Sequence, residues 1–160
     1  MRKRYVALLR AISNVSMKTF REKMEELGFT DVESYGMSGN LLFNAQEKDT
    51  GSLAQRLTTR FGTPAVVRTD SQVARVVAQD PFGSSILFLT RSPTTAKRNT
   101  FLALDFESPQ PVIHGKTIYF VHPARLSGKR ASFDFEEALG VLGTARSARV
   151  VRQILARMTK

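Results

Sequence analysis

Short apolar runs alternate with helical stripes along the first seventy residues, and this order constrains the fold more than any other feature. Apolar and alternating runs predict four strands, at residues 5–9, 32–35, 41–43 and 64–69. Apolar side chains spaced three and four residues apart predict two helices, at residues 17–27 and 53–61, with Ser16 as the N-cap of the first. The order β-α-β-β-α-β is the pattern of a ferredoxin-like subdomain, which we expect over residues 1–70.

The remaining residues, 71–160, are expected to form a second, related α/β layer. Asp70 is the expected N-cap of its first helix, and Ser92-Pro93 is the expected start of the second. Strands are predicted at residues 86–90, 112–114 and 117–122. Two C-terminal helices are predicted around residues 132–139 and 144–158. The fold class is therefore α+β with two small packed subdomains, and no strict sequence repeat relates the two halves.

The chain carries a strong positive charge and no cysteine. Lys and Arg total 24 against 14 Asp and Glu, which gives a formal net charge of +10. Such a balance attracts nucleic acid, anionic lipid or acidic small molecules, although it also serves solubility alone. The lack of cysteine removes disulfides, thiol nucleophiles and cysteine-based metal sites. Arg10 interrupts the first apolar run and no run is long enough for a membrane helix, so we expect a cytoplasmic protein without a membrane partner.

Three stretches of the sequence resemble one bacterial family. They are "YVALLRAI" at the start, "MKTFREKMEELGFTDVESYGMSGNLLF" in the middle and "ALGVLGTARSARVVRQIL" near the end. Members of the family catalogued as domain of unknown function 1697 typically open Tyr-Val-Ala-Leu-Leu-Arg-Gly-Ile-Asn-Val-Gly-Gly. They continue with a Ser-Gly-Asn hairpin and carry a Thr-Ala-Arg-Asn-Trp element near the end. The resemblance implies a two-part α+β fold and brings no established activity or cofactor.

The chain departs from the family pattern at three places. The usual glycine-containing first loop reads Ala11-Ile-Ser-Asn-Val-Ser16, without glycine. The later Gly-Arg-Ser-Lys-Leu segment reads Leu126-Ser-Gly-Lys-Arg130, and Ser147-Ala148 replaces the Asn-Trp pair. If these loops build a common ligand site in the family, this member is expected to bind another ligand or to bind the common one weakly.

The stretch Ser38-Gly39-Asn40 is best explained as the turn of a β-hairpin. Glycine and asparagine tolerate positive φ, and predicted strands flank them on both sides. A nucleophilic Ser38 would need a nearby base, yet the only histidines are His114 and His122, on either side of another predicted hairpin. The alternative is a turn whose amides also contact a ligand. The two histidines lack a third ligand at an obvious spacing, so no metal is predicted.

A small-anion site is a second hypothesis for the N-terminal half. The loop at residues 10–16 follows a strand and precedes a helix, and a helix N-terminus favours an anion. It lacks the glycines and the lysine of a Walker-type loop, and simple N-capping is the more economical explanation. The candidate ligand-binding residues would converge in a cleft between the subdomains, and they are Arg10, Asn14, Ser38, Asn40 and Arg146.

The last predicted helix is amphipathic and basic. At about 100° per residue its basic side chains fall within an arc of about 140°, opposite an apolar arc. The basic arc contains Arg146, Arg149, Arg152, Arg157 and Lys160. A solvated face is the common explanation of such a pattern, and a surface for nucleic acid phosphates is the functional one. The nucleic-acid candidates are Lys129, Arg130, Arg149, Arg152 and Arg157.

A ferredoxin-like sheet can also bind RNA through exposed aromatic side chains, but the basic-aromatic signature of that mode is absent. Strand alternation is expected to send one of Tyr119 and Phe120 to the core and the other outward. Because no catalytic set is found, the leading hypothesis is a non-enzymatic binding protein with an anionic ligand, nucleic acid first. The alternative is an enzyme or sensor that acts on a small phosphate- or carboxylate-bearing molecule. No cofactor is predicted, and the oligomeric state is not predicted.

Overall fold

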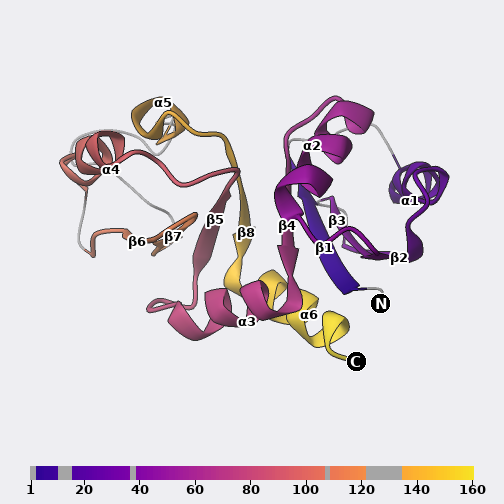
Figure 1. Ribbon diagram of the computed structural model, residues 1–160. Helices are drawn as coiled ribbons and strands as arrows, with labels where there is room; N and C mark the ends of the chain where they lie inside the picture. Colours follow the sequence, from indigo (N-terminus) through magenta and orange to yellow (C-terminus); the bar gives the residue numbers. More distant parts are fainter. Residues whose placement is uncertain (1–2, 11–15, 37–38, 107–108, 122–134) are drawn as a thin grey trace. The chain divides into compact units, whose positions relative to one another are not determined.

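The computed structural model of the chain describes residues 3–10, 16–36, 39–106, 109–121 and 135–160 (Figure 1). They form two compact units. Unit 1 comprises Met1–Ala78 together with Val151–Lys160, and unit 2 comprises Gln79–Val150. The division at residue 70 expected from the sequence stays a prediction.

Unit 1 contains the predicted β-α-β-β-α-β order. Its elements are β1 (Lys3–Leu9), α1 (Met17–Glu26), β2 (Thr30–Tyr35), β3 (Asn40–Ala45), α2 (Thr50–Phe61) and β4 (Ala65–Thr69). The sheet order is β2-β3-β1-β4, and each neighbouring pair is antiparallel. The helix α3 (Asp70–Gln79) follows β4 without a loop. The ferredoxin-like prediction for the first subdomain is therefore confirmed.

The core of unit 1 lies between its sheet and the two helices α1 and α2 (Figure 1). Strand β1 contributes Tyr5, Ala7 and Leu9 to this core, as period-two alternation requires. The helices contribute side chains at helical spacing, namely Phe20 and Met24 from α1 and Leu53 and Leu57 from α2. The tyrosine hydroxyl of Tyr5 donates a hydrogen bond to the carbonyl of Glu47, which ties β1 to the segment that leads into α2.

Unit 2 has the same arrangement of strands and helices. Its elements are β5 (Ser85–Leu89), α4 (Thr95–Leu102), β6 (Val112–His114), β7 (Thr117–Phe120), α5 (Phe135–Leu139) and β8 (Gly143–Ser147), and α6 (Ala148–Met158) follows. The antiparallel sheet has the order β6-β7-β5-β8. An aromatic cluster fills its core, in which the ring of Phe101 contacts Phe106, Phe120 and Phe135. The expected α+β class and both C-terminal helices are confirmed.

One predicted boundary in this half is wrong. The last helix begins at Ala148, because Gly143–Ser147 forms the edge strand β8, paired with β5. Strand alternation explains the local pattern, since Thr144 and Arg146 are buried whereas Ala145 is exposed. The hydroxyl of Ser147 then accepts a hydrogen bond from the Val150 amide and caps the helix.

The correction makes the two units topological repeats. Each contains strands and helices in the order β-α-β-β-α-β, and along the chain each last strand is followed directly by a helix, α3 or α6. The two strand orders match when each strand is replaced by the one four places later. The match extends to single positions: Arg68 on β4 pairs with Val6 on β1, and Arg146 on β8 pairs with Ile86 on β5. Both arginines are the penultimate residues of their strands, and each strand leads directly into a helix.

Two predicted N-caps are also displaced by the structure. Thr69, and not Asp70, caps α3, since the Thr69 hydroxyl accepts from the Gln72 amide while the Gln72 side chain accepts from the Thr69 amide. This reciprocal pair is a capping box. Thr94, and not Ser92, caps α4, because its side chain accepts from the Lys97 amide and the helix starts only at Thr95. Ser16 caps α1 as predicted, and its hydroxyl accepts from the Thr19 amide.

The central strands of both sheets are buried on both faces. In unit 1 the face opposite the main core carries Val6, Leu8, Leu42 and Val66, together with Asn40 and Arg68, and all six side chains are buried. In unit 2 the corresponding face carries Ile86, Phe88 and Tyr119 together with Thr117, Thr144 and Arg146, again all buried. Neither sheet therefore presents an open platform through its central strands.

Candidate functional site

Helix α6 divides into a buried stripe and an exposed basic stripe. Ala148, Val151, Ile154 and Met158 are buried at the three- and four-residue spacing of one helix face. Arg149 and Arg152 are exposed, and so is Lys160 just beyond the helix. The apolar arc predicted for this helix is therefore confirmed as a buried stripe. The buried stripe fixes the helix, so the arginines project from a rigid support.

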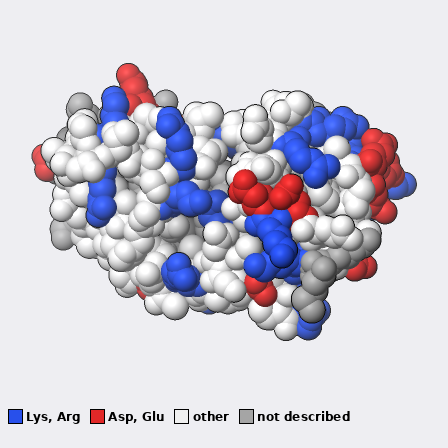
Figure 2. Space-filling model, in the orientation of Figure 1, with Lys and Arg blue, Asp and Glu red and all other residues white. Residues whose placement is uncertain are grey.

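The basic stripe of α6 has no acidic neighbour on its own helix. The helix sequence ARVVRQILARM contains neither Asp nor Glu. Within the described parts of the chain, Arg149 and Arg152 form no ion pair and no side-chain hydrogen bond. Figure 2 shows Lys and Arg side chains spread widely over the face in view, whereas Asp and Glu side chains gather in a few places. Unit 1, which holds most of α6, has fifteen Lys and Arg against eight Asp and Glu.

Arg157 differs from the other two arginines because it packs within unit 1. Its guanidinium carbon lies 4.6 Å from the centre of the Tyr35 ring, a cation–π contact with the end of β2. Its side chain is partly buried, and its Nε atom makes no hydrogen bond with the described residues. This contact anchors the C-terminal turn of α6. Arg157 is therefore less accessible to a nucleic acid than Arg149 or Arg152.

Arg146 lies on β8, so its predicted place in the helical basic arc is wrong. It is buried, and its guanidinium donates to the Thr144 hydroxyl at 2.6 Å and to the Ala145 carbonyl at 2.8 Å. Burial lowers its pKa to about 10, because desolvation disfavours the charged form.

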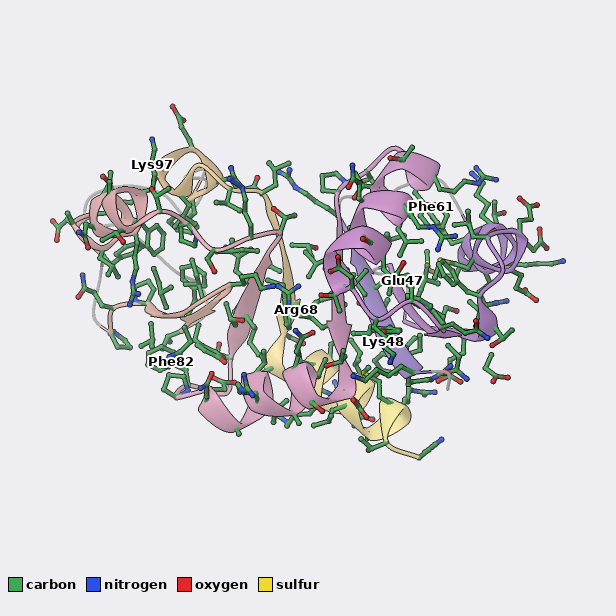
Figure 3. The ribbon with its side chains drawn as sticks, in the orientation of Figure 1. Glu47, Lys48, Phe61, Arg68, Phe82 and Lys97 are labelled. Atoms are coloured by element: carbon green, nitrogen blue, oxygen red, sulfur yellow. The ribbon has the colours of Figure 1, made fainter. Side chains whose placement is uncertain are left out.

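Arg68 is the counterpart of Arg146 in unit 1, and the sequence-based hypotheses did not include it (Figure 3). It is buried on β4 and donates to the Val67 carbonyl at 3.0 Å. Desolvation lowers its pKa to about 10, as it does for Arg146. The signal that could have found it is the pair of matching stretches Val67-Arg68-Thr69 and Ala145-Arg146-Ser147, each placed directly before a helix.

Apart from Arg146, the structure describes two of the small-anion candidates, Asn40 and Arg10. Asn40 is the first residue of β3 and is 1% exposed, and its Nδ2 donates to the Tyr35 carbonyl at 3.0 Å. Arg10 follows β1, and its backbone amide and carbonyl bond to Pro64 and Thr63. Asn14 and Ser38 lie outside the described residues, as do the nucleic-acid candidates Lys129 and Arg130. Asn40 therefore belongs to the strand of its hairpin, and Gly36 and Gly39 take the positive φ angles of 66° and 82°.

The aromatic pair on β7 does not provide a stacking platform for RNA. Phe120 joins the aromatic core of unit 2, as alternation predicts. Tyr119 points to the other face but is 0% exposed, so the expected outward aromatic is wrong. Burial raises the pKa of Tyr119 to about 12, with a further contribution from the charge of Asp80. The face of the sheet that carries Tyr119 is covered, so the Tyr119 ring cannot stack on a nucleic acid base.

The remaining predictions concern the two histidines, a metal site and a membrane helix. His114 pairs with Thr117 across the β6–β7 hairpin, and its ring lies 5.8 Å from that of Tyr119. His122 lies outside the described residues. Within the ranges that the structure describes, no cluster of three or more metal-ligating side chains is present. None of the described helices combines the length and the apolar character that a membrane crossing requires.

One protein family has a sequence model that matches most of the chain. The model described as "Protein of unknown function (DUF1697)" matches residues 2–119. The chain belongs to this family. The resemblance seen in the sequence is therefore confirmed, although the matched range ends before the C-terminal Thr144-Ala-Arg146 element. No curated protein matches the chain significantly.

Among solved structures, the DUF1697 chain is similar to the conserved bacterial protein SP0830 from Streptococcus pneumoniae. The two share 21% sequence identity and a TM-score of 0.69, and the match covers 100% of each chain. At this identity the similarity shows the fold alone. It supports the two-unit α+β architecture and carries no statement about activity.

Proposed function

We propose that this DUF1697 protein is a non-enzymatic binding protein that contacts nucleic acid phosphates through the exposed arginines of α6. The observation that carries the proposal is the combination of a buried apolar stripe with Arg149 and Arg152 exposed on the same helix. Two guanidinium groups without carboxylate partners on a fixed helix cost little to reorganise when they bind an anion. Each can form charge-assisted hydrogen bonds with phosphate oxygens.

The spacing of the two arginines suits a repeating phosphate backbone. They are three residues apart, which places them on one side of the helix with an axial offset of roughly 4.5 Å. The formal net charge of +10 adds a long-range attraction that raises the rate of association with a polyanion. Lys160, just beyond the C-terminal end of α6, is also exposed.

The proposed contact is with the backbone and not with the bases. Phosphate contacts position a protein on nucleic acid but carry no sequence information. Base recognition by a ferredoxin-like sheet needs exposed aromatic side chains on its strands, and in both units the central strands are buried on both faces. We therefore expect binding with little sequence preference and with a strong dependence on salt.

The experiment compares two charge-matched double variants in a fluorescence-anisotropy assay with a labelled 20-nucleotide DNA and the matching RNA. R149E/R152E reverses the proposed contact, whereas K18E/R98E makes the same change in net charge at exposed positions on α1 and α4. We expect the first variant to lose at least about tenfold in affinity at low salt and the control to lose about threefold or less. Absence of salt-dependent binding by the unmodified protein, or equal losses in both variants, would refute the proposal.

The small-molecule alternative stays a hypothesis for the residues Arg10, Asn40 and Arg146. The Asn40 amide donates to the Tyr35 carbonyl, and the Arg146 guanidinium donates to Thr144 and Ala145. Each side chain therefore hydrogen-bonds to residues of its own sheet. No observation in either unit favours this alternative over the α6 surface.

A further inference from the structure

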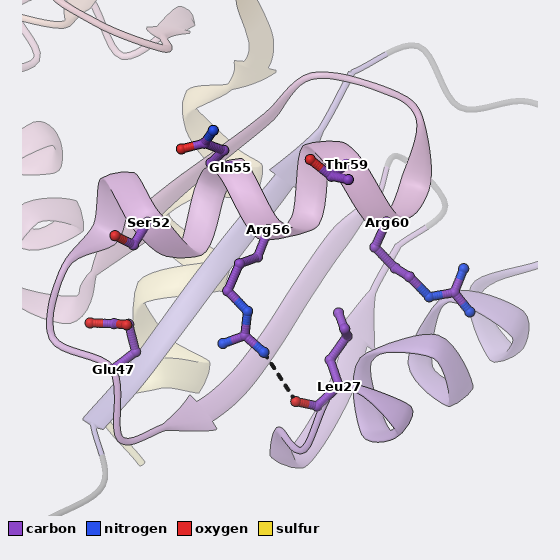
Figure 4. Close-up of a pocket in the computed structure, with 7 residues that line it drawn as sticks. All are labelled: Leu27, Glu47, Ser52, Gln55, Arg56, Thr59 and Arg60. Atoms are coloured by element: carbon purple, nitrogen blue, oxygen red, sulfur yellow. Dashed lines mark hydrogen bonds between the residues drawn. The ribbon is translucent and has the colours of Figure 1, made fainter.

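An open groove runs beside α2 in unit 1, away from the buried faces of the sheet (Figure 4). Its volume is about 640 Å³, within the range of small-molecule sites. One wall consists of polar side chains of α2 between Ser52 and Arg60, and the opposite side includes Leu27 and Glu47. A smaller hollow of about 270 Å³ shares Leu27, Glu47 and Arg56 with it. These three residues therefore line both hollows.

Arg56 is held in a defined orientation inside this groove. Its guanidinium carbon lies 5.0 Å from the centre of the Phe29 ring, and Phe29 belongs to the core of unit 1. One of its terminal nitrogens, Nη2, donates to the Leu27 carbonyl at 3.3 Å. A guanidinium has five N–H donors, and Arg56 makes no other hydrogen bond or ion pair with the described residues. Most of its donors are therefore available to a ligand.

Glu47 supplies a fixed negative charge in the same groove. Its Oε1 accepts hydrogen bonds from the amides of Lys48 and Asp49, at 3.1 and 3.3 Å, and its backbone carbonyl accepts from Tyr5. Within the described chain its Oε2 atom has no hydrogen-bond or ion-pair partner. Figure 4 shows Arg56 extending from α2 between Glu47 and Leu27. The groove thus presents one oriented cation and one oriented carboxylate.

Two other charged residues at or beside the groove, Arg60 and Asp49, are already engaged. Arg60 forms an ion pair with Glu26 at 3.0 Å. Asp49 caps α2, accepting from the Gly51 amide and the Ser52 hydroxyl. Both hydrogen bonds lower the pKa of the Asp49 carboxyl, the one from Gly51 more than the one from Ser52. Among the residues that line the groove, the charged side chains left for a ligand are therefore Arg56 and Glu47, one positive and one negative, unlike the basic stripe of α6.

From this balance we infer that the groove binds a small zwitterion, an amino acid or a short peptide that carries both a free carboxylate and a free ammonium group. The carboxylate accepts from Arg56 and the ammonium group donates to Glu47, while the hydroxyls and amides of α2 bond to the backbone of the ligand. A phosphate chain would meet the Glu47 carboxylate and be repelled. The inference does not rest on the proposed nucleic-acid function, because it uses other residues.

The test uses the full chain and isothermal titration calorimetry with alanine, leucine and trialanine, and with N-acetyl-trialanine and trialanine amide. We expect a free zwitterion to bind and each blocked form of trialanine to bind about tenfold or more weakly, because each lacks one charged hydrogen bond. R56Q should weaken trialanine in the same way but leave trialanine amide unaffected. E47Q, which keeps the shape of the side chain, should act only on ligands with a free ammonium group.

Two matched variants serve as controls for these changes. E22Q on α1 and R98Q on α4 remove the same charges at exposed positions that do not line the groove, and they should leave the affinity unchanged. Preference for alanine over trialanine would identify a free amino acid, and the reverse would identify a peptide. No binding of any of the three zwitterions at millimolar concentration would overturn the inference. Equal binding of the blocked forms, or unchanged affinity in both R56Q and E47Q, would do the same.

Discussion

Asn40 ties the first hairpin together through its side chain and not through a turn conformation. It lies on β3, opposite Leu8 on β1 and Tyr35 on β2, and it is 1% exposed. Its amide satisfies the carbonyl of Tyr35, the last residue of β2. The sequence predicted the turn from Gly39 and Asn40, since both residues tolerate positive φ. It could not place Asn40 inside the strand, because the decisive contact depends on the strand register.

Replacing Asn40 with alanine should destabilise unit 1. The buried Asn40 side chain would be lost, and the partly buried Tyr35 carbonyl would lose its donor, which together cost about 1–3 kcal/mol. Urea-induced unfolding measures this loss directly. Asn99, an exposed asparagine on α4, is the matched control, and N99A should change the free energy of unfolding by no more than about 0.5 kcal/mol. A similar stability for N40A and N99A would contradict the structural role assigned to Asn40.

The connection from β8 to α6 shows why some element boundaries could not be predicted. The stretch Gly143–Ser147 is short, contains the three small residues Gly143, Ala145 and Ser147, and runs straight into a helix. Arg146 also fits the basic arc of that helix, so helical spacing extends falsely into the strand. The strand is specified by its partner β5 and not by its own propensity. In contrast, α1 and α2 have clear caps and apolar stripes, and their positions were predicted closely.

Gly143 is needed for the β5–β8 pairing because a side chain has no room there. A Cβ atom at this position would lie 2.7 Å from the Phe88 carbonyl oxygen and 3.0 Å from a methyl group of Leu89. G143A should therefore destabilise unit 2 by about 1–3 kcal/mol, as overpacking does. Ala145 on the same strand is exposed, so A145S is the matched control with little expected change. Thermal unfolding that is unaltered in G143A would show that β8 is not paired as described.

At the scale of the whole molecule, the chain repeats one topology twice but distributes its charge unevenly. The repeated β-α-β-β-α-β-α order was hidden in the sequence because β8 had been assigned to the last predicted helix, which left the second half one strand short. The basic character was visible from composition, and the α6 pattern indicated where it collects. Which arginines are exposed could not be predicted, because burial of Arg146 and packing of Arg157 on Tyr35 depend on tertiary contacts.

The salt dependence of nucleic acid binding tests the central claim most directly. On duplex DNA, each phosphate that a protein neutralises contributes about 0.9 to the magnitude of the slope of log affinity against log salt concentration. R149Q/R152Q should therefore reduce the magnitude of the slope by about 2 relative to the unmodified protein, while K18Q/R98Q leaves it nearly unchanged. An unmodified protein that binds without salt dependence, or an equal slope in R149Q/R152Q, would contradict the claim that α6 binds phosphates.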